Sequence, residues 1–171
     1  MYIEIIILSM LRHGPIHGYE LKQRIRKVTL NELSNNSLYP ALRRFELSGT
    51  ATKSVEAQDG RPARNVYEIT ERGREQFRSM ISTLPPELAS NDEEFLVRVG
   101  LFAEIPVDDR LEILRARDAA LAERLAGLKS LNAMRSRSPD RRWRDLTTAR
   151  YIASTESERA WIADLRRQAT N

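Results

Sequence analysis

The order of the periodic segments in the first half narrows the possible folds more than any other feature of the sequence. Three segments carry apolar residues at three- and four-residue steps, the spacing of an amphipathic helix. They cover residues 3–11, 18–28 and 38–45. Two β-rich runs follow, residues 50–55 and 65–70, on either side of Asp59 and Gly60, a pair that favours a hairpin turn. Three helices followed by a hairpin is the element order of a winged helix-turn-helix with a two-stranded wing.

Glycine, proline and asparagine mark where these helices are expected to begin and end. Gly14 and Pro15 stop the first segment, because glycine loosens the backbone and proline cannot continue a helix. Asn35 or Asn36 is well suited to cap the third helix. Pro40 then has to lie in the first turn of that helix, where its missing N–H removes no hydrogen bond.

Two consecutive prolines, Pro85 and Pro86, divide the chain into two predicted domains. Residues 1–85 form the winged helix-turn-helix, which is expected to bind DNA. Residues 86–171 form a helical domain, which is expected to provide dimerisation and the response to an effector. The two domains together predict a mainly α fold.

Long helices are expected in the second half. Asn91, followed three residues later by Glu94, resembles a capping box that opens the first of them. A helix beginning at Pro106 carries leucines at alternating three- and four-residue steps, with Asp118 in the one gap. These leucines are Leu111, Leu114, Leu121, Leu125 and Leu128. They predict a coiled-coil-like seam, and we expect this seam to hold two copies of the chain together.

The excess positive charge lies in the first half. The formal net charge is +4, with 13 Lys and Arg against 9 Asp and Glu in residues 1–85, and 15 of each in residues 86–171. A basic module joined to a neutral one is typical of a protein that binds a polyanion with one half and another protein with the other. Ordinary surface variation also produces an excess of this size, so charge alone leaves both interpretations open.

Composition argues against several classes of protein. The chain has no cysteine, which excludes disulfides, thiolate nucleophiles and cysteine zinc sites. No apolar stretch reaches the ~20 residues of a membrane helix, and the apolar run after Glu4 has no basic leader, so we expect a cytoplasmic protein without a signal peptide. The two histidines, His13 and His17, lie beside glycines without acidic residues at metal-ligand spacing. We therefore expect no enzymatic activity, no metal and no cofactor, and we interpret His17 as a turn or helix-entry residue.

The third helix and the hairpin carry the candidate DNA contacts. With the apolar face of the helix against the core, a step of about 100° per residue turns other positions outward. The outward positions are Asn36, Pro40, Arg43 and Arg44, flanked by Ser37 and Tyr39. The basic residues of the hairpin are Lys53, Arg61 and Arg64. Arginine can pair with guanine or phosphate, and asparagine, serine and tyrosine can bond phosphates or bases. A solvated helix face and an ordinary charged turn are the alternatives.

Three stretches of the first half resemble the signatures of the PadR family of transcriptional regulators. They are GPIHGYEL at residues 14–21, SLYPALRRFE at 37–46 and GRPARNVYEITERG at 60–73. Their order and separations also match, whereas any one of them alone is a weak signal. Asn36 stands where the family usually has glycine, and asparagine tolerates the left-handed backbone better than most residues. The second half resembles the longer subgroup of the family in length and helical character.

The resemblance implies a homodimeric regulator, usually a repressor, that binds a palindromic operator in double-stranded DNA. The C-terminal helices would pair across the two-fold axis, so that two recognition helices and two wings address half-sites one helical turn apart, about 34 Å. The implied recognition-helix contacts are Ser37, Tyr39, Pro40, Arg43 and Arg44, and the implied wing contacts are Lys53, Arg61 and Arg64. In some relatives a small aromatic or phenolic effector releases the DNA.

Trp143 and Trp161 are the candidate effector contacts. A last helix is predicted from about residue 140 to residue 168, and the two tryptophans lie 18 residues apart on it, so that they project from the same side. They are placed to flank a flat ligand between this helix and the winged domain. The alternative is that they pack in the core or in an interface, which tryptophan does more often than it binds a ligand.

A winged-helix protein-interaction module without specific DNA binding is the main alternative function, because a fold does not settle a function. The outward arginines on the third helix and the hairpin distinguish the two. If they contact phosphates, the affinity for DNA falls steeply as salt rises. A module that binds only protein would show no such dependence.

Overall fold

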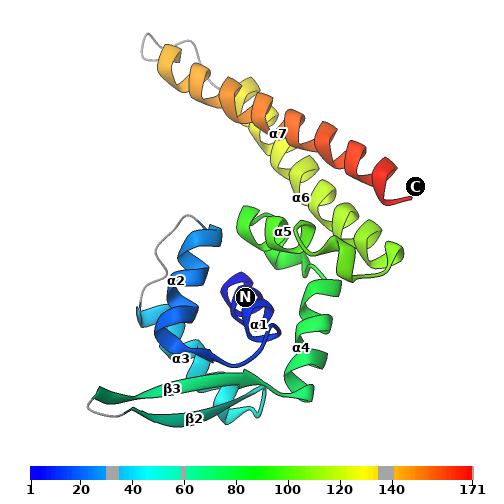
Figure 1. Cartoon of the computed structure of the whole chain (residues 1–171). Helices are drawn as coiled ribbons and strands as arrows, with labels where there is room; N and C mark the ends of the chain where they lie inside the picture. Colours follow the sequence, from blue (N-terminus) through cyan, green and yellow to red (C-terminus); the bar gives the residue numbers. More distant parts are fainter. Residues whose placement is uncertain (30–34, 59–60, 135–140, 171) are drawn as a thin grey trace. The chain divides into compact units, whose positions relative to one another are not determined.

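The computed structural model describes residues 1–29, 35–58, 61–134 and 141–170. The chain forms two compact units, which we call the winged unit (Met1–Ile81) and the helical unit (Ser82–Asn171) (Figure 1). The division lies a few residues before the pair of prolines at which the sequence predicts it. Among the helices described, none has the length and apolar character needed to cross a membrane.

The winged unit has the element order that the sequence predicts, three helices, a hairpin and a further helix. The helices are α1 (Tyr2–Leu11), α2 (Gly18–Thr29), α3 (Asn35–Leu47) and α4 (Glu71–Ser82), and the strands are β1 (Ile16–His17), β2 (Ala51–Gln58) and β3 (Arg61–Ile69). The predicted winged helix-turn-helix with its two-stranded wing is therefore confirmed. The short strand β1 is an addition that the sequence analysis does not predict.

Strand β1 turns the wing into a three-stranded antiparallel sheet of order β1-β3-β2. Ile16 pairs with Tyr67 and His17 with Val66, so the two residues before α2 are hydrogen-bonded to the inner strand of the sheet. His17 is thus a strand residue, and it directly precedes α2, so it lies at the helix entry that we gave as one of its two expected positions. A two-residue strand leaves no periodicity in the sequence, which is why the pattern does not reveal it.

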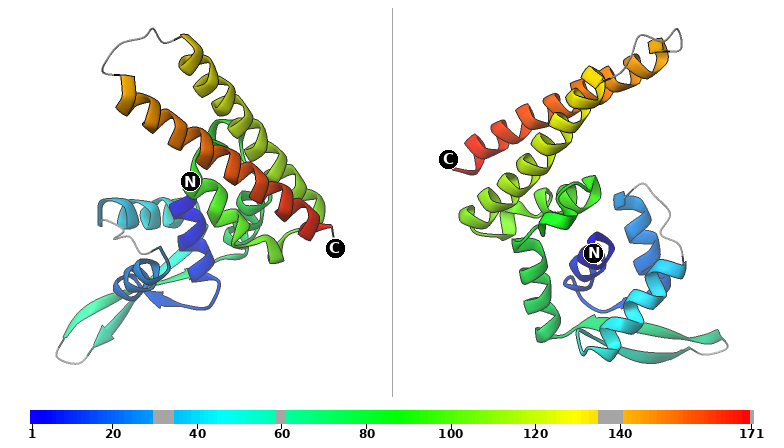
Figure 2. Two further views of the ribbon diagram at one scale, coloured as in Figure 1. Left: turned by 90° about the horizontal axis from the view of Figure 1, so that it is seen from above. Right: turned by 180° about the vertical axis from the view of Figure 1, so that it is seen from behind.

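Helix α1 supplies the centre of the core of the winged unit. Its side chains of Ile5, Ile7, Leu8 and Leu11 are buried, and it contacts α2, α3 and β3. The rear view in Figure 2 looks almost along α1, with α2 and α3 on one side of it and α4 on the other. Each buried side chain of this size contributes roughly 1.5–3 kcal/mol through removal of apolar surface from water.

Helix α3 begins earlier than the sequence predicts, and it ends where the sequence predicts, before Gly49. It starts at Asn35, so Pro40 lies inside the helix and not in its first turn. The proline has no N–H to donate, and the helix continues because four buried side chains on the opposite face hold it against the core. These are Leu38, Ala41, Leu42 and Phe45. Gly49 ends the helix with a φ of 71°, and the N–H of Thr50 donates to the carbonyl of Phe45 at 2.8 Å, a Schellman-type end.

Thr70 joins the wing to α4. As predicted, it caps that helix: its hydroxyl oxygen accepts a hydrogen bond from the N–H of Gly73 at 3.1 Å. The same hydroxyl donates to the carbonyl oxygen of Gly49 at 2.7 Å. Gly73 is buried so closely that a Cβ there would lie 2.1 Å from the carbonyl oxygen of Thr50. The end of α3, the wing and α4 therefore meet at one tightly packed joint.

The helical unit is built from two long helices and shorter segments. These are η1 (Pro86–Leu88), α5 (Asp92–Val99), η2 (Phe102–Glu104), α6 (Val107–Met134) and α7 (Arg141–Ala169). Helix α7 runs back along α6 and packs against it (Figures 1 and 2). Two long helices and a capped short one are the elements that the sequence predicts for this half.

The predicted capping box at the start of α5 is half formed. The side-chain oxygen of Asn91 accepts a hydrogen bond from the N–H of Glu94 at 2.9 Å, as predicted. The carboxylate of Glu94 pairs with the fully buried guanidinium of Arg98 at 2.9 Å. Arg98 also donates to the carbonyl oxygen of Thr83 at 2.6 Å, which ties α5 to the segment after α4.

The predicted leucine seam packs within one chain. Leu114, Leu121 and Leu125 are buried, and Leu111 and Leu128 are half-buried, on the face of α6 that packs against α7. The apolar surface of these side chains is thus largely covered within one chain, and their part in a contact between two copies stays a prediction. The heptad-like spacing reports a helix pair equally well whether the second helix comes from the same chain or another.

Asp118, the gap in the leucine seam, also faces α7. Its carboxylate accepts a hydrogen bond from Arg159 at 2.7 Å and lies 3.5 Å from Arg166. The hydrogen bond from Arg159 is the main reason that the pKa of Asp118 lies below its usual value, and partial burial opposes the shift. The charge that interrupts the apolar stripe is therefore paired across the two helices.

Arg117 holds four segments of the helical unit together. Its buried guanidinium donates to Glu158 of α7 at 2.8 Å and to the carbonyl oxygen of Ala89 at 2.9 Å, and it is also bonded to Asp92 at the start of α5. It lies over the ring of Phe95, 5.3 Å from the ring centre. A buried guanidinium with these partners selects one arrangement of the helices, because any other arrangement leaves the charge unpaired.

We predict that Gly73→Ala lowers the free energy of unfolding by about 1–3 kcal/mol, because the new methyl group collides with backbone at Thr50. Gly127→Ala in α6 is the matched control. A Cβ at Gly127 meets nothing within 4 Å, and alanine is favoured over glycine in a helix by about 1 kcal/mol, so this variant should be more stable. Urea denaturation measures both. A Gly73→Ala variant as stable as the wild type would contradict the packing at this joint.

A second prediction concerns pH. A carboxylate whose pKa is lowered by folding stabilises the protein above its unfolded pKa, about 3.9, and loses that effect as pH falls through its folded pKa. Asp118→Asn should therefore melt below the wild type at neutral pH, and the gap should close as the solution becomes more acidic than about pH 4. Asp164→Asn, which removes an exposed pair with Arg167 within one helix, is the control with a smaller effect. A gap that stays constant down to low pH would mean that Asp118 acts through packing.

Candidate nucleic-acid interface

The outer face of α3 presents polar and basic side chains. Pro40, Arg43 and Arg44 are exposed, as the helical pattern predicts, and so is the ring of Tyr39. Ser37 is half-buried on the flank. The face with these side chains is opposite the buried apolar face, so the core holds the helix while leaving one side open to a partner.

Arg43 and Arg44 differ in their surroundings. The guanidinium of Arg44 forms an ion pair with Glu4 of α1 at 2.7 Å, although its side chain is 60% exposed. No side chain in the described part of the chain forms an ion pair with Arg43. Arg43 is therefore the cation of α3 that an incoming anion meets without first displacing a carboxylate.

The wing adds basic side chains next to α3. Lys53 on β2 and Arg64 on β3 are exposed on the hairpin, which extends past the helices in Figure 1. The side chains of Asn36 and Arg61, two other predicted contacts, lie outside the part of the structure that is described. Lys53 and Arg64 are thus the two predicted wing contacts whose exposure the structure reports.

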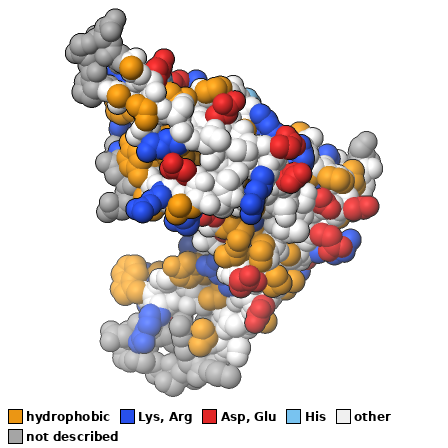
Figure 3. Space-filling view, turned by 90° about the horizontal axis from the view of Figure 1, so that it is seen from below, with side chains coloured by type: hydrophobic (Ala, Val, Ile, Leu, Met, Phe, Trp, Pro, Cys, Tyr) orange, Lys and Arg blue, Asp and Glu red, His pale blue; other side chains and the backbone are white. Residues whose placement is uncertain are grey.

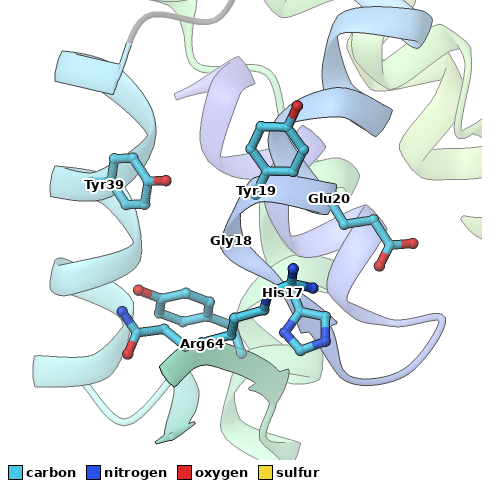
Figure 4. A pocket seen from close by; sticks show the side chains of 8 residues that line it. His17, Gly18, Tyr19, Glu20, Tyr39 and Arg64 are labelled. Atoms are coloured by element: carbon cyan, nitrogen blue, oxygen red, sulfur yellow. The ribbon is translucent and has the colours of Figure 1, made fainter. Parts of the chain in front are cut away.

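A pocket of about 420 Å³ opens between the start of α2, the outer face of α3 and strand β3. It is lined by His17, Gly18, Tyr19, Glu20, Tyr39, Arg64, Asn65 and Tyr67. Figure 4 shows Tyr39 on one side and Tyr19 on the other, with His17 and Arg64 near its lower edge. Two of these residues, Tyr39 and Arg64, belong to the predicted DNA contacts, and the pocket places them together.

Gly18 brings two tyrosine rings close to the start of α2. A Cβ at this position would lie 3.3 Å from the ring of Tyr67 and 3.5 Å from the ring of Tyr39, so glycine leaves room for both. Burial is the main cause that raises the pKa of Tyr67, and the negative charge of Glu46 adds to it. Tyr67 therefore remains an uncharged phenol over the physiological range.

Charged groups around the pocket are largely paired. Glu20 accepts hydrogen bonds from Arg24 at 2.7 and 3.1 Å, and Figure 4 shows its carboxylate turned away from Tyr39. Nε2 of His17 lies 3.3 Å from a carboxylate oxygen of Glu56. On the face of the molecule in Figure 3, basic and acidic side chains are interspersed.

The candidate effector residues do not come together. Trp143 is 73% exposed and lies under Arg142, whereas Trp161 packs edge-on against Phe95 with ring centres 6.0 Å apart. Both lie on the continuous helix α7, and 18 residues of helix span roughly 27 Å. This separation is too long for one small ligand to touch both side chains in one chain. They face the same side, as predicted, but on different parts of the unit.

Sequence reasoning missed six residues of the pocket, among them His17, Tyr19 and Tyr67. His17 and Tyr19 lie in the first of the three signature stretches, and Tyr67 lies in the third. The sequence contains both stretches, but it does not show that they meet at one pocket. The pairing of β1 with β3 brings them together. Within the described residues, no cluster of His, Asp and Glu side chains is arranged to hold a metal ion.

Two family models match the chain, one in each half. The transcriptional regulator PadR-like family matches residues 7–79, and the virulence activator alpha C-terminal family matches residues 93–169. Together they account for most of the sequence. No curated protein matches the chain.

The chain is also similar to several solved structures. A PadR-like transcriptional regulator from Bacillus cereus is 30% identical, with 45% of this chain and 75% of that chain covered and a TM-score of 0.41. A transcriptional regulator from Clostridium thermocellum is 31% identical, with coverages of 46% and 77% and a TM-score of 0.43. PadR of Bacillus subtilis, solved in complex with operator DNA, is 15% identical over 99% of both chains, with a TM-score of 0.47.

The family match in the winged unit covers all three signature stretches as well as α2, α3 and the wing. The 30% identical relative adds a regulator of the same family, three quarters of which aligns with this chain. A family of transcriptional regulators also agrees with the expectation that the chain is not an enzyme. The chain belongs to the PadR-like family of transcriptional regulators.

Proposed function

We propose that this regulator binds a palindromic operator in double-stranded DNA as a homodimer and represses transcription in the cytoplasm. The observation that carries the proposal is the exposed, unpaired Arg43 on the outer face of α3, beside the exposed basic side chains of the wing. A rigid helix with an unpaired guanidinium is the arrangement that reads guanine in the major groove. Lys53 and Arg64 would then reach phosphates beside the groove.

In this proposal the two arginines of α3 have different roles. Arg43 contacts a base edge, and it contributes to sequence preference. Arg44 is oriented by Glu4 and approaches the backbone, where its net contribution is smaller because the carboxylate partly cancels its charge. The remaining α3 contacts are Asn36, Ser37, Tyr39 and Pro40, and Arg61 completes the wing.

We propose that the helical unit supplies the dimer interface, with exposed apolar side chains near the end of α6 and the start of α7. Leu131, Trp143 and Leu146 are each more than half exposed. Large apolar side chains gathered on one end of a helix pair usually mark a surface that a partner covers. The leucines buried between α6 and α7 would then stabilise each protomer, and the interface would lie on its outer surface.

A response to a small aromatic ligand is the remaining part of the proposal. Trp161 supports it, because its ring is 38% exposed and rests on Phe95, so a ligand beside it would change its environment. Tryptophan fluorescence of a Trp143→Phe variant, in which Trp161 is the only indole, would report such binding directly.

The function is tested by fluorescence anisotropy of the purified protein on a labelled duplex from its own upstream region, with scrambled competitor, at low and moderate salt. We expect binding that weakens steeply with salt and that resists the competitor. Binding lost equally to scrambled DNA would mean that the operator lies elsewhere. Absence of binding at low salt would favour a protein-interaction module.

We predict that Arg43→Ala weakens operator binding by about 1–3 kcal/mol and relaxes preference at one base pair. Arg44→Ala should cost less and should weaken operator and random duplexes alike. Glu4→Gln, which releases Arg44 from its ion pair, should strengthen binding to both duplexes. Anisotropy titrations on the operator and on the random duplex measure all three. If Arg43→Ala weakens both duplexes equally, Arg43 contacts phosphate and not a base.

We predict that Leu146→Glu shifts the protein from dimer to monomer in sedimentation velocity without loss of helical circular dichroism, because a carboxylate placed in an apolar interface has no partner. Ala163→Glu, at an exposed position near the other end of α7, is the control that should remain dimeric. In contrast, acidic substitutions at Leu121 or Leu125 should unfold the helix pair. A Leu146→Glu protein that still sediments as a dimer would place the interface elsewhere.

A further inference from the structure

We propose that the pocket between β1, α2, α3 and β3 holds one phosphodiester of the DNA backbone, and that the hydroxyl groups of Tyr67 and Tyr19 donate to it. This inference rests on the proposed function and adds residues that the predicted set of DNA contacts does not include. Such a contact carries no sequence information, so it positions the protein on every duplex. The hydroxyl groups of Tyr67 and Tyr19 can donate hydrogen bonds, and neither has an acceptor among the described residues.

Tyr67 is the central observation. Its side chain is 5% exposed and lines the pocket, yet its hydroxyl forms no hydrogen bond with any residue in the described part of the chain. The hydroxyl oxygen is not one of the fully buried polar atoms that lack a partner, so it opens onto the pocket, where an acceptor can reach its proton. Because burial keeps the phenol protonated, it can donate to an anion and cannot repel one.

Tyr19 is positioned as a second donor. The amide of Gln23 donates to the hydroxyl oxygen of Tyr19 at 3.0 Å, one turn along α2. This bond uses a lone pair of the oxygen and leaves the phenol proton available. Gln23 thus orients a hydroxyl whose own hydrogen bond is still to be made, at the opposite side of the pocket from Tyr39 (Figure 4).

Two further features of the pocket favour a phosphate. The first turn of α2 begins at Gly18, and the N–H groups of a first helical turn, which have no partner inside the helix, favour a negative charge. Arg64 adds a cation at the rim, without an ion pair among the described residues.

The acidic groups near the pocket do not cancel this preference. Glu20 is bonded to Arg24, and Glu56 is 3.3 Å from His17. Glu46, the carboxylate that acts on Tyr67, lies on α3 and does not line the pocket. Nδ1 of His17 is buried without a partner among the described residues, so a hydrogen bond at this atom is still to be made.

The test pairs a protein change with a change in the DNA. Tyr67→Phe removes only the hydroxyl, and a methylphosphonate removes the charge of one phosphate at a time from the labelled duplex. We expect Tyr67→Phe to weaken binding about tenfold, the loss of one hydrogen bond to a charged group, on operator and random duplexes alike. One methylphosphonate position should weaken wild-type binding and have little further effect on Tyr67→Phe.

Stability and a matched variant separate this role from a structural one. Since the Tyr67 hydroxyl has no partner among the described residues, Tyr67→Phe should melt at or above the wild-type temperature while binding DNA less well. Tyr151→Phe, at an exposed tyrosine of α7, should change neither property. Tyr19→Phe should weaken DNA binding as Tyr67→Phe does, but it also removes the acceptor of the Gln23 hydrogen bond.

Each outcome bears on either the pocket or the function. If the wild type binds DNA but Tyr67→Phe binds equally well, or if every methylphosphonate position affects both proteins alike, the pocket is not a phosphate site and the proposed function stands. If the wild type binds no duplex, the proposed function fails and the phosphate site fails with it. Tight binding of adenosine monophosphate, with DNA binding unchanged in Tyr67→Phe, would assign the pocket to a free phosphorylated ligand and overturn the proposal.

Discussion

The pairing of β1 with β3 is the constraint on which the winged unit depends. Ile16 lies opposite Tyr67, so the chain enters α2 directly from a strand that is hydrogen-bonded to the wing. The start of α2 is thereby held beside the sheet, and Gly18 lets the rings of Tyr67 and Tyr39 close in on it. Helix α3, the wing and the first turn of α2 become three walls of one pocket. Without this two-residue strand, these walls would be separate surfaces.

Ion pairs within the winged unit determine which charged side chains remain available to bind an anion. Arg44 is held by Glu4 and Glu20 by Arg24, whereas Arg43 and Arg64 have no ionic partner among the residues described. The net charge of the chain is modest, so the overall field attracts DNA only weakly. Arg43 and Arg64 can therefore meet an anion without first displacing a carboxylate.

In the helical unit, the paired charges are buried guanidinium groups that connect segments of the fold. Arg117 links η1, α5 and α7, and Arg98 ties α5 to the segment after α4. Replacing such pairs with apolar residues often costs little stability, so their main effect is to exclude other arrangements of the helices. The heptad-like spacing of leucines on α6 would suit a partner helix from either chain. Within one chain, α7 packs against α6, and Asp118 is paired with Arg159 across the two helices.

Local signals in the sequence determined the elements and the family. Helical periodicity, the two β-rich runs, the cap at Thr70 and the three signature stretches depend only on neighbouring residues, and the structure reproduces the elements that they predict. The predicted turn at Asp59 and Gly60 lies outside the described residues. The tertiary structure alone decided what meets across the chain: the β1 pairing, the pairing of Arg44 with Glu4, and the use of the leucine seam by α7. These contacts join residues far apart in sequence, and periodicity identifies the buried face of a helix without naming what covers it.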